Sequence, residues 1–257
     1  MMLFAGKLKI FIDLAVTIFI WAYFILGFLL FFAPHYGLAW LFAGDREAAF
    51  QRLNQLFFRS FFRILQRITP GLDLRIQGDL SGMHSSIVIS NHLSYLDPLL
   101  LVSLFEMQKT IVKKTFFKVP IFSYLLHESG YMPATNGADD SVLMIRNCED
   151  IKEYLACGGN VFIFPEGTRS RTGLLGPFNK GAFSIAHYCR APIQCLLIRR
   201  TNRLFLPGRF LFNTCVSNTI EVERIGSFVP DYLNPDFSLT ALIREIRTLY
   251  EKRLKES

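Results

Sequence analysis

Near its start the chain carries a long apolar run. Residues 14–33 give 20 consecutive positions without a charged side chain, and Thr17 is the only clearly polar one. A helix of this length spans about 30 Å at 1.5 Å per residue, which is the thickness of a bilayer core. We predict a membrane helix that either crosses the bilayer or forms a re-entrant hairpin with the next helix. Pro34, Gly37 and Gly44 predict a bend after it.

The next segment, residues 46–68, repeats apolar side chains at helical spacing and sets arginines between them. The apolar positions are Phe50, Leu53, Leu56, Phe57, Phe61, Ile64, Leu65 and Ile68, and the basic ones are Arg52, Arg59, Arg63 and Arg67. A basic amphipathic helix of this kind is typical of a segment that lies among lipid headgroups. The alternative is a helix that packs its apolar face on a globular core. If the first helix crosses the bilayer, these arginines place the next domain on the cytoplasmic face of the membrane. In a bacterium this would be the inner membrane.

From residue 70 onward, short apolar runs alternate with helical patterns. Strands are predicted at 74–76, 87–89, 110–112, 160–164, 193–198 and 219–222, and helices at 95–107, 121–128, 139–156, 181–189 and 239–255. Such alternation predicts an α/β fold with a mainly parallel sheet flanked by helices. The chain is therefore expected to divide into N-terminal membrane-embedded or membrane-docking helices, 1–69, and a globular domain, 70–257.

Composition adds an expected partner. The net charge is +7, the chain is 51% hydrophobic, and half of its 26 phenylalanines precede residue 70. An anionic partner is expected, either a phospholipid membrane or a substrate that carries phosphate. Nucleic acid is not expected, because no nucleic-acid-binding motif is present. The five cysteines form no CxxC pair, so the sequence indicates neither a disulfide framework nor a zinc site.

A first polar cluster follows the predicted strand at 87–89. His92 stands at the carboxyl end of that strand, where open α/β sheets place ligands, and Asp97 lies five residues further on. A turn that folds the carboxylate onto the imidazole would make a general base. A free imidazole has a pKa of about 6.5, so it can accept a proton near neutral pH. The alternative is that Ser94 and Asp97 form a capping box that only starts a helix.

A second polar cluster, residues 165–170, follows the predicted strand at 160–164. Gly167 lets the backbone approach a ligand closely, and Arg169 offers a planar fork that suits two phosphate oxygens. Because both clusters follow the carboxyl ends of strands, we expect them to face one crevice.

His92 and Asp97 form an HX4D motif, which Asn91 precedes. Together with residues 164–170, these residues resemble the signature blocks of the glycerolipid acyltransferase family, which includes 1-acylglycerol-3-phosphate acyltransferases. The resemblance covers about residues 72–225. It implies that His92 is the general base and that Asp97 is its partner. The residues that it implies for substrate binding are Asn91, Lys113, Lys114, Glu166, Gly167, Thr168 and Arg169.

The resemblance also implies a reaction. A fatty acyl group passes from acyl-CoA or an acyl carrier protein to the free hydroxyl of lysophosphatidate, without a metal or bound cofactor. Residues 130–136 lack the basic residue usual in the family, and Cys195 replaces a second proline, which leaves Arg199, Arg200 and Arg203 as candidates to compensate. The alternatives are another lysophospholipid or hydroxylated amphiphile, such as a lyso-ornithine lipid, and a non-catalytic lipid-binding module.

Other catalytic signatures are absent from the sequence. It contains no GxSxG elbow, no GxxxxGK[ST] phosphate loop and no GxGxxG dinucleotide fingerprint. His35, His84, His127 and His187 stand without ligand spacing, so we interpret them as surface or packing residues.

Overall fold

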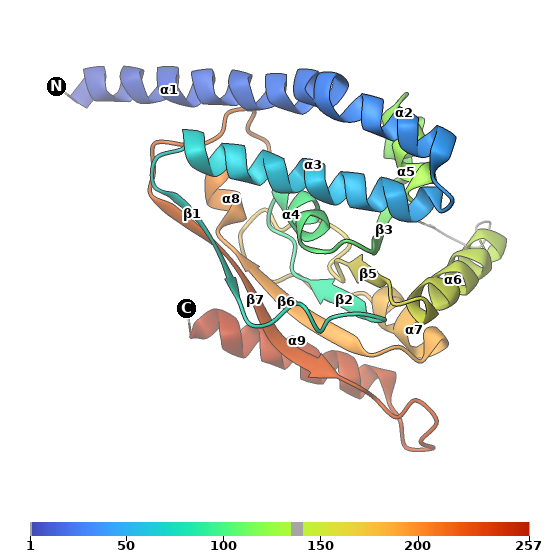
Figure 1. Cartoon of the computed structure of the whole chain (residues 1–257). Coiled ribbons are helices and arrows are strands. Elements are labelled where there is room, and N and C mark those ends of the chain that lie inside the picture. The colour runs from blue at the N-terminus through green and yellow to red at the C-terminus, as the bar shows by residue number, and fades with distance from the viewer. Residues whose placement is uncertain (1, 135–140, 257) are drawn as a thin grey trace.

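A central sheet with helices on both faces organises the chain (Figure 1). The computed structural model describes residues 2–134 and 141–256. Within them the sheet has seven strands in the order β1-β7-β6-β2-β5-β3-β4. The strands are β1 (Leu72–Gln77), β2 (Ile87–Ser90), β3 (Gln108–Val112), β4 (Met132–Pro133), β5 (Asn160–Ile163), β6 (Ile193–Arg199) and β7 (Asn218–Phe228). Only the β6–β7 pairing is antiparallel, which confirms the predicted mainly parallel sheet.

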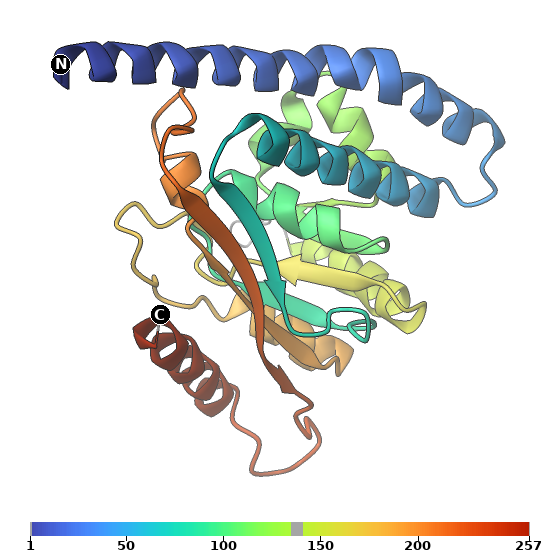
Figure 2. The ribbon, with the colours of Figure 1, turned by 60° about the vertical axis from the view of Figure 1, so that its left-hand side comes forward.

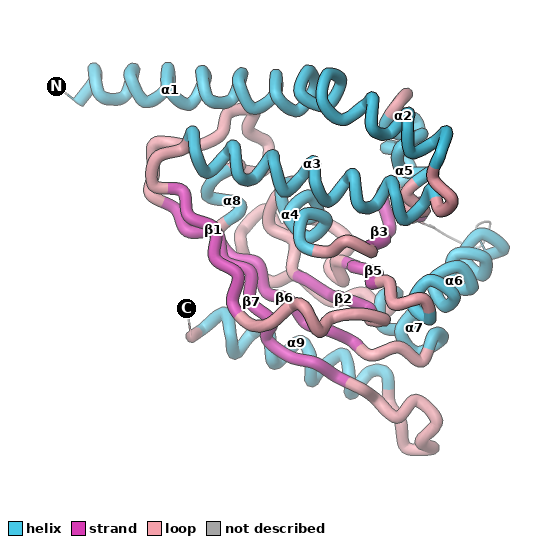
Figure 3. Tube along the Cα trace, viewed as in Figure 1, coloured by secondary structure: helices cyan, strands magenta, loops and turns pink. Residues whose placement is uncertain are grey.

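Helices precede, connect and follow these strands (Figure 3). They are α1 (Met2–Ala22), the π-helix η1 (Tyr23–Phe32), α2 (Ala33–Phe42), α3 (Arg46–Ile68), α4 (Leu96–Leu104), the 3-10 helix η2 (Lys114–Lys118), α5 (Phe122–Glu128), α6 (Ser141–Ala156), α7 (Gly181–Cys189), α8 (Thr201–Leu204) and α9 (Leu239–Lys255). The bounds of α7 and α9 agree with the prediction to the residue. The short elements β4, η2 and α8 were not predicted, and the predicted start of α6 at Asp139 lies outside the described residues.

The strands alternate their side chains between two cores. Val88 and Ile198 face the core that α3 and α4 cover, whereas Ile87 and Cys195 face the core that α6, α7 and α9 cover. Figure 2 shows α3 and α4 on one side of the sheet and α9 on the other. Because the central strands are buried on both faces, they are mostly apolar and not amphipathic, as is usual for parallel strands.

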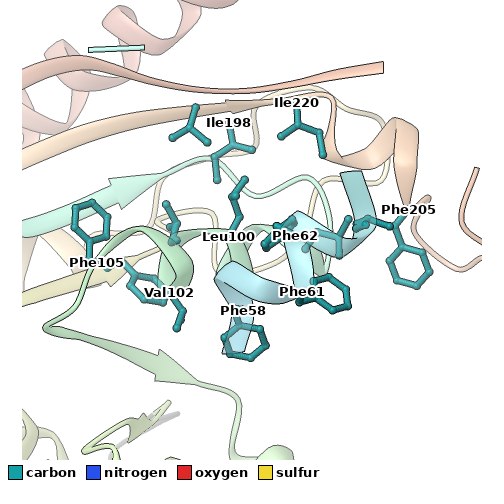
Figure 4. Packing of buried hydrophobic residues seen from close by; sticks show 14 of the residues in the cluster. Phe58, Phe61, Phe62, Leu100, Val102, Phe105, Ile198, Phe205 and Ile220 are labelled. Carbon is teal, nitrogen blue, oxygen red and sulfur yellow. The ribbon is translucent and has the colours of Figure 1, made fainter. Parts of the chain in front are cut away.

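Helix α3 belongs to the sheet domain. Its phenylalanines, including Phe58, Phe61 and Phe62, are buried in the core with Leu100 of α4, as Figure 4 shows. Its Asn54 also donates a hydrogen bond to the Ser129 hydroxyl at 2.8 Å. The expectation that this apolar face lies in lipid is therefore corrected, because the face has the sheet domain as its partner.

The polar side of α3 is exposed. Arg52, Arg59, Arg63 and Arg67 all lie on the surface. The alternative interpretation of the amphipathic pattern, a helix packed on a globular core, is thus the one that the structure shows. Residues 46–68 share their core with residues 70–257, so the predicted boundary at 69/70 does not divide two cores.

The N-terminal rod of α1, η1 and α2 is continuous. Residues 7–42 are long and apolar enough to cross a membrane. Pro34 occupies the first turn of α2, where its missing N–H costs no hydrogen bond, and the rod changes direction near the join of η1 and α2, as Figures 1 and 2 show. The chain reverses direction at residues 43–45, which include Gly44, and Asp45 caps α3 by accepting a hydrogen bond from the Ala48 N–H at 2.9 Å.

One side of this rod holds the globular domain. Asp13 accepts hydrogen bonds from the backbone and hydroxyl of Thr214 at 2.8 and 2.7 Å, and Thr17 accepts one from the Phe212 N–H at 2.9 Å. The opposite side exposes large apolar residues such as Phe11 and Phe31. The rod is therefore fixed to the domain and still offers an apolar face outward, which indicates membrane association.

Candidate active site

His92 and Asp97 meet in the turn between β2 and α4. The His92 Nδ1 lies 2.9 Å from Oδ2 of Asp97, and the Asp97 side chain is fully buried. The same Oδ2 accepts hydrogen bonds from the N–H groups of Leu93 and Ser94 at 2.5 and 2.7 Å. A buried carboxylate needs such donors to offset its lost hydration, so the turn folds around Asp97.

Capping and pairing with histidine occur together in this turn. The Ser94 Oγ accepts a hydrogen bond from the Leu96 N–H at 3.3 Å, while Asp97 reaches back to the Ser94 N–H. The capping box and the His–Asp pair are therefore not alternatives. One carboxylate starts α4 and orients the imidazole.

The second oxygen of Asp97 has a partner that the sequence analysis missed. Thr201, in the first turn of α8 directly after β6, donates a hydrogen bond from its Oγ1 to Oδ1 of Asp97 at 2.5 Å, and its residue surface is fully buried. No motif marks Thr201. The only available signal was its position just past the carboxyl end of a predicted strand, at the edge where His92 also lies.

The His92 imidazole packs against an aromatic ring and remains partly exposed. It stacks on the Phe164 ring at a centroid distance of 4.2 Å, and its side chain is 16% exposed. With Nδ1 turned to Asp97, Nε2 has no hydrogen-bond partner among the described residues. An imidazole oriented in this way can take a proton from a hydroxyl that approaches Nε2.

Asn91 holds the end of β2 in place. Its amide exchanges two hydrogen bonds with the Ile198 backbone, donating to the carbonyl and accepting from the N–H, both at 2.8 Å. The residue is buried, and both ends of its amide are used. Asn91 thus shapes the turn, and its side chain faces the backbone of β6, whereas the resemblance implies a role in substrate binding.

The two polar clusters join directly. The His92 N–H donates to Oε1 of Glu166 at 2.9 Å, and the Ser170 N–H donates to the His92 carbonyl at 2.8 Å. This contact follows from the sheet, since β2 and β5 are adjacent and parallel and end at the same edge. The two clusters therefore lie together at the carboxyl ends of β2 and β5, and the crevice that they are expected to face stays a prediction.

Glu166 is buried beneath the site. Its Oε2 accepts a hydrogen bond from the Gly176 N–H at 2.7 Å, so its two oxygens bind backbone on both sides. Burial raises the pKa of this carboxyl above its ordinary value, and the two N–H donors act in the opposite direction. Glu166 therefore positions the 165–176 loop against His92.

Gly176 and Gly167 permit this loop geometry. A Cβ on Gly176 would lie 2.8 Å from Oε2 of Glu166, so a side chain there would push the carboxylate away. Gly167 has a φ of +68°, which favours glycine, and a Cβ there would meet the Asn179 side chain at 2.9 Å. Glycine in this loop serves close approach within the protein.

Arg169 is the basic side chain of the second cluster. Its guanidinium carbon lies 3.2 Å from the centroid of the Tyr95 ring. Its Nη1 is buried and has no hydrogen-bond partner among the described residues. A buried guanidinium nitrogen without an acceptor is costly, and an anionic ligand such as phosphate would satisfy it.

The other predicted substrate-binding residues lie at the surface of this sheet edge. Thr168 is exposed, and Lys113 and Lys114 are exposed just past the carboxyl end of β3. Two arginines proposed to compensate for the missing basic residue are paired elsewhere, Arg199 with Glu223 at 2.6 Å and Arg200 with Glu221 at 3.1 Å. Arg203 is exposed.

A cavity of about 640 Å³ lies at the opposite edge of the sheet. It is lined by residues near the amino ends of strands β3 and β5, such as Met107 and Asn160, and by Arg52 of α3. None of the proposed site residues lines it. The described residues contain no group of three or more His, Cys, Asp or Glu side chains that could hold a metal ion.

Comparisons with known proteins bear on this site. A family model described as Acyltransferase matches residues 73–199, a range that includes both turns. The chain is 33% identical over 166 residues to 1-acyl-sn-glycerol-3-phosphate acyltransferase BAT2, chloroplastic, of Brassica napus, covering 62% of this chain and 47% of that protein. It is 29% identical over 169 residues to the 1-acyl-sn-glycerol-3-phosphate acyltransferase of Saccharomyces cerevisiae, covering 63% and 55%. The chain thus spans about half the length of these relatives.

The fold has a solved counterpart. The crystal structure of the 1-acyl-sn-glycerophosphate (LPA) acyltransferase PlsC from Thermotoga maritima is similar with a TM-score of 0.72 and 19% sequence identity, over 95% of this chain and 96% of that one. The similarity extends to the N-terminal helices as well as the sheet domain, since it covers nearly the whole chain. At this identity it shows a shared fold.

Proposed function

Because the chain belongs to the glycerolipid acyltransferase family, we propose that it transfers a fatty acyl group from an acyl thioester to the free hydroxyl of lysophosphatidate, giving phosphatidate. The observation that carries the proposal is the His92–Asp97 pair, with Nδ1 held at 2.9 Å from the carboxylate and Nε2 open. A binding module has no use for a base aligned in this way.

The reaction needs one base and no covalent enzyme intermediate. His92 Nε2 takes the proton of the acceptor hydroxyl as its oxygen attacks the thioester carbonyl. Collapse of the tetrahedral intermediate breaks the carbon–sulfur bond, and the thiolate leaves and takes the proton from the imidazolium. Asp97 stabilises the imidazolium between these two steps and keeps the ring from turning.

The acceptor is bound through its phosphate. Arg169 is the primary contact, because its unpaired Nη1 sits in the same loop that touches the His92 backbone. Lys113 and Lys114 add positive charge from the end of β3. A phosphate held there lies at the sheet edge that also carries the imidazole, which is what transfer to a lysophosphatidate hydroxyl requires.

The acceptor and product are amphiphiles, so the enzyme works at a membrane. The apolar α1–α2 rod supplies the association, and the exposed arginines of α3 favour the cytoplasmic face as the side on which the domain lies. The acyl donor is acyl-CoA or an acyl carrier protein, both of which reach that face from water.

The test compares His92→Ala with His84→Ala in the full chain reconstituted in phospholipid vesicles. His84 is exposed and precedes β2 at the opposite edge of the sheet, so its variant controls for loss of a histidine. Transfer of label from acyl-CoA or acyl carrier protein to lysophosphatidate should fall at least about 1,000-fold in His92→Ala and stay unchanged in His84→Ala.

Parallel assays with other acceptors complete the test. Lysophosphatidylcholine, a lyso-ornithine lipid and monoacylglycerol are offered under the same conditions. Faster turnover of one of these than of lysophosphatidate would replace the acceptor and keep the reaction. Retained transfer in His92→Ala, or no transfer by the wild-type chain to any acceptor, would overturn the proposal.

A further inference from the structure

Residues 113–124, here named the η2–α5 segment, expose apolar side chains between lysines. Phe116 is 40% exposed, Val119 47%, Ile121 65% and Tyr124 46%. The three lysines of the segment, Lys113, Lys114 and Lys118, are exposed as well. Large exposed apolar groups gathered in one short segment mark an interaction surface and not ordinary solvent exposure.

The segment is held in this shape by its inward residues. Phe117 and Phe122 pack against the core, and the Phe117 ring contacts the His127 ring at 5.0 Å. Ile121 has a φ of +64°, a conformation that a β-branched residue rarely adopts. The fold therefore keeps Ile121 in an unfavourable conformation at a position where its side chain is two-thirds exposed, which points to a use for it there.

The segment lies beside the end of the N-terminal rod. The Phe50 ring of α3 contacts both Tyr36 of α2 and Tyr124 of α5, at 5.0 and 6.3 Å. Figures 1 and 2 both show the green segment of η2 and α5 rising to the level of the rod. In α2, Trp40, Leu41 and Phe42 are exposed. The two apolar surfaces are thus neighbours on one side of the molecule.

We propose that the η2–α5 segment inserts its apolar side chains into the membrane surface beside α2 and forms a second lipid contact. Because the segment adjoins the apolar rod, lipid is the partner expected to cover it. The lysines favour anionic headgroups around the inserted residues. The inference rests on the membrane association of the proposed function but adds a distinct surface to it.

This contact has a consequence for the active site. The segment begins directly after the carboxyl end of β3, at the sheet edge that carries His92 and Arg169. Insertion brings this edge to the lipid headgroups, so a lysolipid can reach the site while its acyl chain stays in the bilayer. The entrance for the acceptor then lies between the segment and the bilayer surface.

The test places an environment-sensitive fluorophore on a new cysteine, Ile121→Cys, in the full chain with Cys157→Ser and Cys215→Ser. Val229→Cys is the matched control, since Val229 is 83% exposed and directly follows β7. Figure 1 shows the loop between β7 and α9 at the end of the molecule remote from the rod. The background chain without a new cysteine provides the blank. The protein is reconstituted in phosphatidylcholine vesicles with and without phosphatidylglycerol, and brominated acyl chains serve as quenchers.

We expect brominated lipid to quench the label at position 121 and not at 229, more strongly when phosphatidylglycerol is present. Quenching at 121 only by aqueous iodide, in both kinds of vesicle, would overturn the proposal. So would an emission shift at 121 that requires an acyl carrier protein and not lipid, because the surface would then be a carrier-docking site. The readout needs no turnover, so a chain that inserts position 121 and fails to transfer acyl groups contradicts only the proposed function.

A kinetic arm uses Ile121→Asp, whose aspartate tolerates a positive φ better than isoleucine, with Val229→Asp as control. For a lysolipid presented in vesicles, Ile121→Asp should raise KM by about tenfold, as expected from losing burial of one large aliphatic side chain. The kcat, and the activity on detergent-dispersed acceptor, should stay at the wild-type level. An unchanged KM in vesicles, for this variant and for Ile121→Ala, would contradict the proposal.

Discussion

Thr201 donates a hydrogen bond to Oδ1 of Asp97 at 2.5 Å, across 104 residues of sequence. The other carboxylate oxygen is held by the His92 imidazole and by the turn after β2. Both oxygens of Asp97 are therefore fixed, one from each of two neighbouring strand ends. The orientation of the imidazole depends on β6 as well as on its own turn.

Replacing Thr201 should slow the chemical step. Thr201→Val removes a hydrogen bond to a charged group, worth about 1.5–3 kcal/mol, so kcat should fall by about 10- to 100-fold with little change in KM for the acceptor. Thr201→Ser restores the hydroxyl and should recover most of the rate. A rate loss in Thr201→Ser equal to that in Thr201→Val would show that only packing matters at this position. Thr248→Val on the exposed face of α9 is the control.

Arg169 should determine affinity for the phosphate. Arg169→Lys keeps one positive charge but loses the planar fork and its stacking on Tyr95, so KM for lysophosphatidate should rise by about 10- to 100-fold with kcat nearly unchanged. For monoacylglycerol, which has no phosphate, the same variant should show no change in KM. Initial rates with both acceptors check this. Equal effects on the two acceptors would remove Arg169 from phosphate binding.

Glu166 should make the free energy of unfolding depend on pH. Burial raises its pKa above the ordinary value of 4.5, so the folded state binds the proton more tightly than the unfolded state does. Its contribution to the free energy of unfolding is therefore fully present below the unfolded pKa and is lost as the pH rises through the raised pKa. Glu166→Gln cannot titrate, so wild type should lose stability relative to this variant as the pH rises through that window. Denaturant unfolding in detergent, at a series of pH values, measures the difference; a constant difference would contradict the assignment.

The last helix should act on the site through Arg247. Arg247 donates to the Gly176 carbonyl at 3.0 Å, and the Gly176 N–H binds the carboxylate that holds the His92 backbone. Arg247→Ala should therefore lower kcat by about fivefold, an effect of the size of one hydrogen bond. Arg244→Ala removes an exposed arginine from the same helix and should leave kcat unchanged. Equal kcat values for the two variants would show that α9 does not position the loop.

Some of the site could be predicted from local sequence. His92 and Asp97 are five residues apart, and a tight turn after a buried strand is enough to join them. The meeting of the two polar clusters also followed from sequence, because parallel strands end at a common edge. The sequence singled out Glu166 and Asn91, but it did not indicate that their side chains bind backbone groups, since the side chain of a motif residue can turn to the backbone as readily as to a ligand.

Sequence by itself determined the order of the longer strands and helices along the chain, the mainly parallel sheet and the two polar turns, because these depend on periodicity and on strand ends. Only the tertiary structure decided that α3 packs on the sheet, that Thr201 completes the hold on Asp97 and that the η2–α5 segment lies beside α2. The sequence of an amphipathic helix does not show whether its apolar face packs on lipid or on protein. A hydrogen bond between residues 104 positions apart leaves no local pattern in the sequence. Both are decided by which surfaces the assembled sheet brings together.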